Sequence, residues 1–232
     1  MLRYAVIGLG RFGTTLARHL GDLGAEVVAI DHREERVAEV RDHVSVAIRL
    51  DATTERNLRE HGLEGVDVAV VGMGENFEAT QLVTVILKRL GVGRVVVKAP
   101  TPLQYEILTR IGADEVVSPE KESAIRLAQR LLSPRILDYI ELAEGYSLVQ
   151  LKAPPAFVGK SLRELDVRRV YGVNVVAMKR VVEVGVETGG DGEERARLEE
   201  RFVGTTDPTD VIEEGDVLVV IGADADLDRL AN

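Results

Sequence analysis

Three glycines near the start of the chain have a spacing that can hold phosphate. Gly8, Gly10 and Gly13 form the pattern GxGxxG directly after an apolar run, and Asp31 closes the next apolar run. In such a pattern the first glycine makes a tight turn, the second lets the backbone approach a pyrophosphate, and the third allows close helix–strand packing. The aspartate would accept hydrogen bonds from a ribose and repel a 2′-phosphate. The pattern predicts a nucleotide site; the alternative is a Rossmann-like fold with an empty pocket.

Two basic side chains lie at positions in the sequence from which they could contact such a nucleotide. Arg11 lies inside the glycine pattern, where a guanidinium would favour a ligand with additional phosphate charge. Lys98 closes a later apolar run, and in a doubly wound sheet that edge faces the ligand. The alternative for Lys98 is a strand-end lysine that reaches solvent.

Acid–base catalysis has weaker support. A dehydrogenase needs a general acid or base that faces its nicotinamide. None of the four histidines has a constellation of partners in the sequence, so surface or packing roles are favoured for His19, His32, His43 and His61. An NAD-dependent oxidoreductase stays the alternative function.

The elements that must position these residues alternate between apolar runs and amphipathic stretches. Helical periodicity is present in Phe77–Leu90, where Leu82, Val85, Ile86 and Arg89 recur three or four apart. This alternation predicts a doubly wound, Rossmann-like parallel sheet of the α/β class. Its expected strands are Tyr4–Ile7, Glu26–Ile30, Ser45–Arg49, Asp67–Val71, Arg94–Val97 and Glu115–Val117. Left-handed helix caps are expected at Gly24, Gly62, Gly91 and Gly112.

A second module follows Ser133-Pro134, which ends a helical run. We expect residues 1–133 to form the nucleotide-binding domain and residues 134–232 to form a smaller α+β domain. Its expected elements are strands at Tyr146–Lys152, Asn174–Lys179 and Val217–Ile221 and helices near Ser161–Leu165 and Ala225–Leu230. Residues 185–201 are glycine-rich and then charged, which predicts a solvated hairpin insertion with no assigned role.

Composition excludes several classes of function. The formal net charge of −10 over 232 residues disfavours binding to nucleic acid or to an anionic membrane. The chain has no cysteine, which excludes disulfides and thiolate metal sites. No signal peptide and no apolar run of about 20 residues is recognisable. We therefore expect a cytoplasmic protein that reaches a membrane only through a partner.

A series of motifs extends over nearly the whole chain in order: GLGRFG, AID, DAT, VKAP, IGADEVVSPEKESA, LDYIEL, GKSLRELDVRRVYGVNVVAMKR and PTDVIEEGDVLVVIG. Together they resemble the cytoplasmic regulators of bacterial Ktr and Trk potassium uptake, the KtrA/TrkA family, which are built from an RCK domain (regulator of conductance of potassium). The resemblance implies a non-enzymatic sensor that binds ATP, ADP or NAD(H) and assembles through dimers into an octameric ring. The implied partner is a membrane potassium-translocating subunit of the KtrB or TrkH kind, which the ring gates. A nucleotide or redox sensor without a channel partner is the alternative.

The resemblance also implies which residues contact the nucleotide. Arg11 would pair with the phosphates, Asp31 with the ribose, and Lys98 would face the base or phosphate region. A stretch around Asp51 would line the adenine, although LDAT departs here from the GDAT of Trk-type relatives. A helix N-cap is the alternative for Asp51. The implied set is Gly8, Gly10, Arg11, Phe12, Gly13, Asp31, His32, Asp51, Ala52, Thr53, Met73, Gly74, Glu75, Lys98 and Glu120.

Glu120 has a second implied role, as a metal ligand. In Ktr regulators the matching glutamate lies at the dimer interface near the phosphates of facing sites, where Mg²⁺ or Ca²⁺ could join carboxylates and phosphates. The alternative is a carboxylate that stabilises a first helical turn, because Glu120 directly follows Pro119.

Arg168 and Asn174 match an arginine and an asparagine of Ktr regulators that bind cyclic di-AMP at a dimer interface. The resemblance therefore implies cyclic di-AMP as an effector. The alternative is structural, with Arg168 as a helix-end charge and Asn174 as a strand-edge residue.

Overall fold

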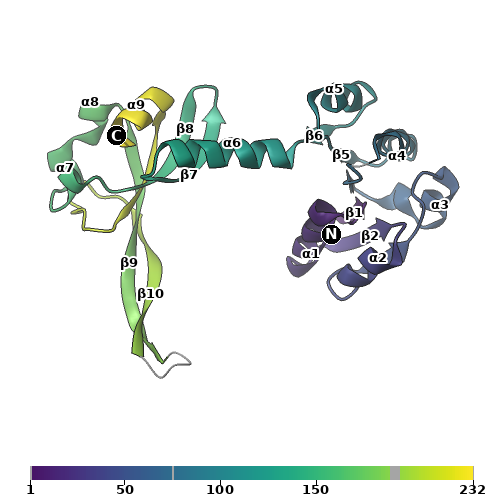
Figure 1. The fold of residues 1–232 in the computed structure, drawn as a ribbon, viewed down its shortest axis with the longest axis horizontal. Coiled ribbons are helices and arrows are strands. Elements are labelled where there is room, and N and C mark those ends of the chain that lie inside the picture. Colours follow the sequence, from purple (N-terminus) through teal and green to yellow (C-terminus); the bar gives the residue numbers. More distant parts are fainter. Residues whose placement is uncertain (1, 75, 189–193, 232) are drawn as a thin grey trace. The chain divides into compact units, whose positions relative to one another are not determined.

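The computed structural model describes residues 2–74, 76–188 and 194–231 (Figure 1). The chain divides into two compact units, unit 1 (Met1–Lys121) and unit 2 (Glu122–Asn232). The domain boundary expected after residue 133 stays a prediction. None of the helices among the described residues combines the length and the apolar character that crossing a bilayer demands.

The described part of unit 1 contains a six-stranded parallel sheet in the order β3-β2-β1-β4-β5-β6. Its strands are β1 (Arg3–Ile7), β2 (Glu26–Asp31), β3 (Val46–Arg49), β4 (Val68–Val71), β5 (Arg94–Lys98) and β6 (Glu115–Val117). Each predicted strand is present, with its ends shifted by at most one residue. The strand order reverses at β1, which pairs with both β2 and β4, and the predicted doubly wound fold is confirmed.

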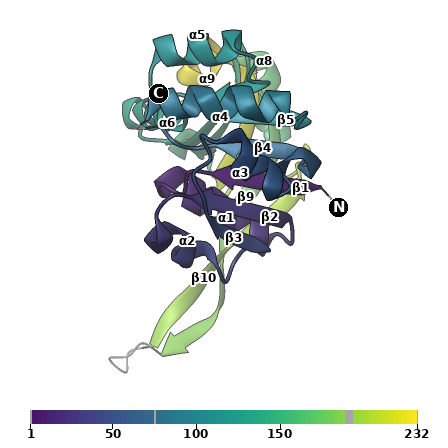
Figure 2. The same ribbon diagram turned by 90° about the vertical axis from the view of Figure 1, so that its right-hand side faces the viewer.

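Helices cover both faces of this sheet (Figure 2). The neighbours Val6 and Ile7 in β1 belong to different core clusters, since successive side chains of a strand point to opposite faces. The cluster of Val6 includes residues of α1 (Arg11–Asp22) and α2 (Glu34–Val40). The cluster of Ile7 includes residues of α3 (Glu55–Glu60), η1 (Leu63–Gly65), α4 (Phe77–Arg89) and α5 (Pro102–Arg110). A further helix, α6 (Pro119–Leu132), begins in unit 1 and ends before Ser133-Pro134, as predicted.

The described part of unit 2 is built on a five-stranded antiparallel sheet in the order β10-β9-β11-β8-β7. Buried side chains such as Leu151, Met178 and Leu218 form its core against the short helices. The elements are β7 (Ile136–Ala143), β8 (Tyr146–Lys152), η2 (Pro155–Phe157), α7 (Leu162–Leu165), α8 (Val167–Tyr171), β9 (Asn174–Thr188), β10 (Glu194–Thr205), β11 (Val217–Ala223) and α9 (Asp224–Ala231).

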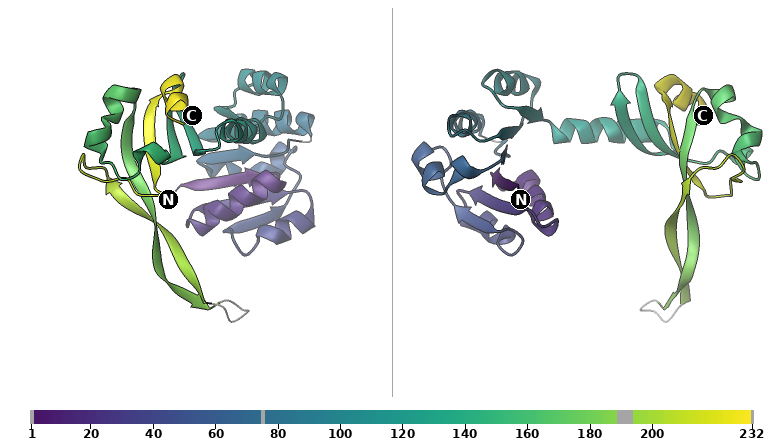
Figure 3. Two further views of the ribbon diagram at one scale, coloured as in Figure 1. Left: turned by 60° about the vertical axis from the view of Figure 1, so that its left-hand side comes forward. Right: turned by 180° about the vertical axis from the view of Figure 1, so that it is seen from behind.

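A long hairpin distinguishes this second sheet. The strands β9 and β10 pair along their length and form a twisted ribbon that extends beyond the other strands of unit 2 (Figure 3). The pairing of β9 with β10 agrees with the hairpin predicted at residues 185–201, of which residues 189–193 lie outside the described part of the chain. The strand expected at Asn174–Lys179 is longer than predicted because it continues into this ribbon.

The helical stretch predicted at Phe77–Leu90 is present as α4, in which Val83, Ile86 and Leu87 are buried and Leu82 is 47% exposed. The strand β7 and the helix α8 were not predicted. In β7, Ile140 and Leu142 are exposed, and the strand has no apolar/polar alternation that would reveal it.

Candidate functional site

Two loops meet at the carboxyl edge of the sheet in unit 1. Gly72, after β4, donates a backbone hydrogen bond to the Ile7 carbonyl of β1, with an N···O distance of 2.7 Å. Gly8, after β1, donates one to the Ile30 carbonyl of β2 at 2.8 Å. The strand order reverses here, and in doubly wound folds ligands bind in the crevice at such a reversal. The loops that carry the predicted nucleotide residues thus lie at the edge that the fold favours for binding.

The glycine loop is packed too closely to accept side chains at Gly8 and Gly13. Gly8 has a φ of +91°, and a Cβ there would lie 2.5 Å from Met73 Cγ. A Cβ on Gly13 would lie 2.0 Å from the carbonyl oxygen of Gly8. Gly10 has more room, because a Cβ there would lie 4.0 Å from Arg36 Nη1. This geometry suits the roles that the sequence predicts for the three glycines.

Gly10 is also the N-cap residue of α1, and no side chain caps the helix there. The first N–H groups of an α-helix have no partner within the helix and attract anions. The backbone at the start of α1 therefore offers hydrogen-bond donors beside the open space at Gly10.

Asp31 ties the glycine loop to the end of β2. The residue is only 4% exposed. Its Oδ2 accepts a hydrogen bond from the Leu9 backbone N–H at 2.7 Å, and its Oδ1 accepts one from the Arg33 backbone N–H at 2.9 Å. Two looser contacts complete its surroundings: His32 Nδ1 lies 3.3 Å from Oδ1 and Arg36 Nη1 lies 3.5 Å from Oδ2. The carboxylate thus shapes the loop, and its role toward a ribose stays a prediction.

A turn after β3 borders the same edge of the sheet. Asp51 Oδ1 accepts hydrogen bonds from the Thr53 hydroxyl at 2.6 Å and from the Thr53 backbone N–H at 3.0 Å. These bonds lower the pKa of Asp51, with a smaller contribution from the charge of His32. The alternative that Asp51 caps α3 is wrong, because the N-cap residue is Thr54 and Asp51 closes a turn before the helix. Ala52, within this turn, is buried in the core.

Lys98 is the last residue of β5, and its side chain lies near Phe12, Gly74 and Glu120. Its side chain is 14% exposed and forms an ion pair with the carboxylate of Glu120. Its Nζ lies 5.8 Å from the centroid of the Phe12 ring, and its Cε would lie 3.8 Å from a Cβ on Gly74. The alternative in which Lys98 reaches solvent is therefore wrong. The bond from Lys98 holds the pKa of Glu120 below its ordinary value, and the charge of Arg11 adds to this effect.

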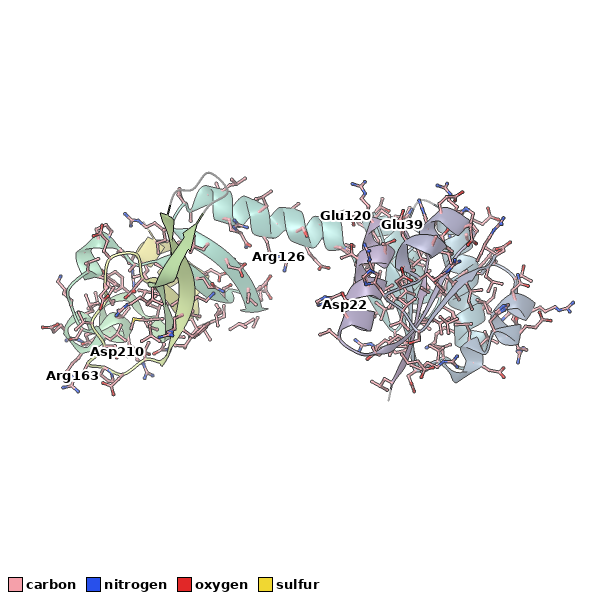
Figure 4. All side chains as sticks on the ribbon, turned by 90° about the horizontal axis from the view of Figure 1, so that it is seen from below. Asp22, Glu39, Glu120, Arg126, Arg163 and Asp210 are labelled. Atoms are coloured by element: carbon pink, nitrogen blue, oxygen red, sulfur yellow. The ribbon has the colours of Figure 1, made fainter. Side chains whose placement is uncertain are left out.

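Glu120 lies in the first turn of α6 (Figure 4). This position agrees with the helix-start carboxylate, and the interface ligand stays a prediction. In the part of the chain that the structure describes, no three His, Cys, Asp or Glu side chains gather closely enough to hold a metal ion.

Most residues predicted to bind the nucleotide therefore lie in the loops along one edge of unit 1. Glu75 lies outside the described residues. Arg36 was missed by the sequence analysis, although its guanidinium lies beside both Asp31 and Gly10. Its position in the first turn of α2, the helix that follows Asp31, is the signal that could have identified it.

A second candidate site lies within unit 2. Arg168 on α8 and Asn174 at the start of β9 line one cavity of about 480 Å³, together with Arg163 of α7 and Thr206. Arg163 is labelled in Figure 4. A volume of this size is within the usual range for small-molecule sites, about 300–1,000 Å³. The two residues predicted to bind cyclic di-AMP thus border a common pocket.

Comparison with known proteins gives matches over nearly the whole chain. The family model of the TrkA-N domain matches residues 4–119. The chain is 40% identical over 226 residues to the Ktr system potassium uptake protein C of Bacillus subtilis, covering 97% of this chain and 94% of that protein. It is 33% identical over 230 residues to the Ktr system potassium uptake protein A of the same organism, covering 99% and 96% of the two chains.

The fold also matches solved structures. A crystal structure of the GsuK RCK domain superposes with a TM-score of 0.61 and 17% sequence identity, covering 100% of this chain and 48% of that chain. At this level of identity the match concerns the fold. It agrees with the parallel sheet and the second antiparallel sheet described above.

Proposed function

The chain belongs to the family of Ktr potassium uptake proteins that carry a TrkA-N domain, and from this membership we propose that it is the regulatory subunit of a potassium uptake system. It binds an adenine nucleotide, which is ATP, ADP or NAD(H), and regulates a membrane potassium-translocating subunit at the cytoplasmic face of the membrane. It acts as a regulator and not as an enzyme. Regulation requires that the nucleotide bind one conformation more tightly than the other, because a ligand with equal affinities shifts no equilibrium.

The observation that supports nucleotide binding most strongly is the link between Asp31 and the glycine loop. The Asp31 carboxylate, the uncapped start of α1 and the open space at Gly10 lie together where the strand order reverses. A ribose acceptor and backbone donors for phosphate are thereby combined in one site. Arg11, at the start of α1, adds a cation that favours ligands with more phosphate charge.

Two measurements on the purified full chain test this function. Mass spectrometry should find an adenine nucleotide that copurifies with the protein, and calorimetry should then show that this nucleotide binds again after its removal. Incubation with NADH and candidate carbonyl substrates should leave the NADH unoxidised. Substrate-dependent oxidation of NADH would instead favour the oxidoreductase, and the failure of any adenine nucleotide to bind would contradict the proposal.

The surface of α6 supports a dimer. Four large apolar side chains of this helix are exposed in the single chain: Ile125, Leu127, Leu131 and Leu132. Exposed apolar side chains grouped on one element favour burial against a partner. We propose that α6 contributes to a dimer interface and that dimers assemble into an octameric ring.

At this interface we propose a role for Glu120 in binding Mg²⁺ or Ca²⁺. Both ions prefer oxygen ligands, and the Glu120 side chain is 68% exposed, so its carboxylate is accessible to a partner. Its carboxylate pairs with Lys98 in this structure, so a metal ion would have to share or replace that ion pair. The remaining oxygens would come from the phosphates of bound ATP and from the second chain.

Glu120→Gln should abolish a metal-dependent stabilisation. In wild type with ATP, adding Mg²⁺ or Ca²⁺ should raise the unfolding temperature, because a ligand present at about 100 times its Kd adds about 2.7 kcal/mol. The variant should show no such rise in the same thermal melts. Glu115→Gln, which removes a glutamate paired with Arg94 elsewhere in unit 1, should keep the response. Equal responses in wild type and Glu120→Gln would mean that Glu120 only stabilises the start of α6.

For unit 2 we propose that the pocket at Arg168 and Asn174 binds cyclic di-AMP. Arg168→Ala should lower the affinity at least tenfold, since a hydrogen bond to a charged group contributes about 1.5–3 kcal/mol. The control is Arg229→Ala, which removes an arginine of α9 that pairs with Asp226 at 3.1 Å and does not line the pocket. Calorimetry should show that this control variant binds cyclic di-AMP as tightly as wild type does. Absence of binding to wild type, or equal losses in the two variants, would contradict this assignment.

A further inference from the structure

Arg36 occupies a position that none of the predicted roles includes. It lies in the first turn of α2, and the burial of Val37 and Val40 in the core fixes this helix against the sheet. From there the guanidinium reaches two parts of the nucleotide site at once. Its Nη1 lies 3.5 Å from Asp31 Oδ2 and 4.0 Å from the Cβ position on Gly10. The side chain is 31% exposed, so it is held at the site and still open to a ligand.

The contacts of Asp31 show what a ribose would have to displace. An ionised carboxylate has about four acceptor positions. The backbone N–H groups of Leu9 and Arg33 fill two of them with short bonds, of 2.7 and 2.9 Å. His32 and Arg36 approach at 3.3 and 3.5 Å, which is longer than ordinary hydrogen bonds. Two ribose hydroxyls can therefore reach Asp31 only by replacing these looser neighbours.

The displaced guanidinium has an obvious alternative partner. The space at Gly10, which Arg36 already borders, is where a pyrophosphate would approach the backbone. Arginine binds phosphate oxygens in a planar, two-pronged geometry. We propose that Arg36 is a second phosphate-binding cation: it pairs with Asp31 in this structure and moves to the 5′-phosphates when a nucleotide binds. This inference rests on the proposed nucleotide function.

An exchange of this kind predicts opposite effects on two ligands. Arg36→Met keeps the apolar stem and removes the charge. ADP should bind about tenfold more weakly or worse, because a charged hydrogen bond to its phosphates is lost. Adenosine should bind about two- to fivefold more tightly, since its ribose no longer has to break the pair between Arg36 and Asp31. A residue that only supported the fold would weaken both ligands together.

The two affinities can be measured on the full chain, ADP by calorimetry and adenosine by competition with labelled ADP. Arg41→Met is the matched control, because Arg41 follows the end of the same helix and pairs with Glu34 at 2.8 Å. It should change neither affinity, and Arg36→Lys should recover part of the ADP affinity. If Arg36→Met weakens both ligands equally, or changes neither, the exchange is wrong while the nucleotide function stands. If wild type binds no adenine nucleotide, the proposed function and this inference are overturned together.

Discussion

We expect Asp31→Ala to lower the affinity for ADP and ATP at least tenfold. The substitution removes an acceptor for the ribose hydroxyls, and a hydrogen bond to a charged group contributes about 1.5–3 kcal/mol. It also removes the acceptor for the backbone N–H groups of Leu9 and Arg33, at 2.7 and 2.9 Å. The glycine loop then loses its side-chain link to β2, although the backbone hydrogen bond from Gly8 to Ile30 remains, so the phosphate site is disturbed together with the ribose site.

Calorimetry with each nucleotide provides the measurement, and thermal melts show whether the variant is folded. A buried donor left without a partner costs about 1–3 kcal/mol, so a lower unfolding temperature is expected for Asp31→Ala. The control is Asp22→Ala, at the other end of α1, where Asp22 contacts His43 Nδ1 at 3.2 Å (Figure 4). Its nucleotide affinity should equal that of wild type. Unchanged affinity in folded Asp31→Ala would mean that the nucleotide is not bound as the glycine pattern implies.

Gly13→Ala should have the largest effect on the site, because the added Cβ would collide with backbone atoms of the glycine loop. The added Cβ would lie 2.0 Å from the Gly8 carbonyl oxygen and 3.1 Å from the carbonyl carbon. These atoms belong to the glycine loop, which must move to make room. Overpacking of this kind costs about 1–3 kcal/mol of stability. The movement should also abolish nucleotide binding, since the loop shapes the phosphate site.

Gly21→Ala is the matched control for this substitution. Gly21 belongs to the same helix α1, and a Cβ there would lie 1.7 Å from the His43 carbonyl oxygen, away from the nucleotide residues. Both variants should unfold at lower temperature than wild type. In thermal melts with and without ADP, Gly21→Ala should keep the ADP-dependent rise and Gly13→Ala should lose it. An equal rise in both variants would contradict the placement of the site at the glycine loop.

Much of unit 1 could be predicted because its signals are local. Strands such as Val68–Val71 are short apolar runs, and the left-handed conformations of Gly24, Gly62, Gly91 and Gly112 follow from their places after helices. The buried face of α4 could not be read from apolar periodicity alone, because Thr80 and Thr84 are also buried and bond to carbonyls one turn earlier.

The loops of the candidate site could be predicted from motif spacing, but the contacts within them could not. The pair between Lys98 and Glu120 joins β5 to α6, and nothing in the sequence near either residue indicates it. Arg36 meets Asp31 only because α2 packs on the sheet at a particular angle, which the core side chains decide. Tertiary packing of this kind determines which charged side chains contact one another, and the spacing of residues in the sequence does not predict these contacts.

The most direct test of nucleotide-regulated potassium uptake is a flux measurement. Inside-out vesicles from cells that lack this chain would be supplied with the purified protein, wild type or Asp31→Ala, together with ATP or ADP. We expect wild type to change the potassium flux to different extents with ATP and with ADP, and Asp31→Ala to remove that difference. A flux that is the same with and without the protein, or that responds equally to ATP and ADP with wild type, would contradict nucleotide-regulated potassium uptake.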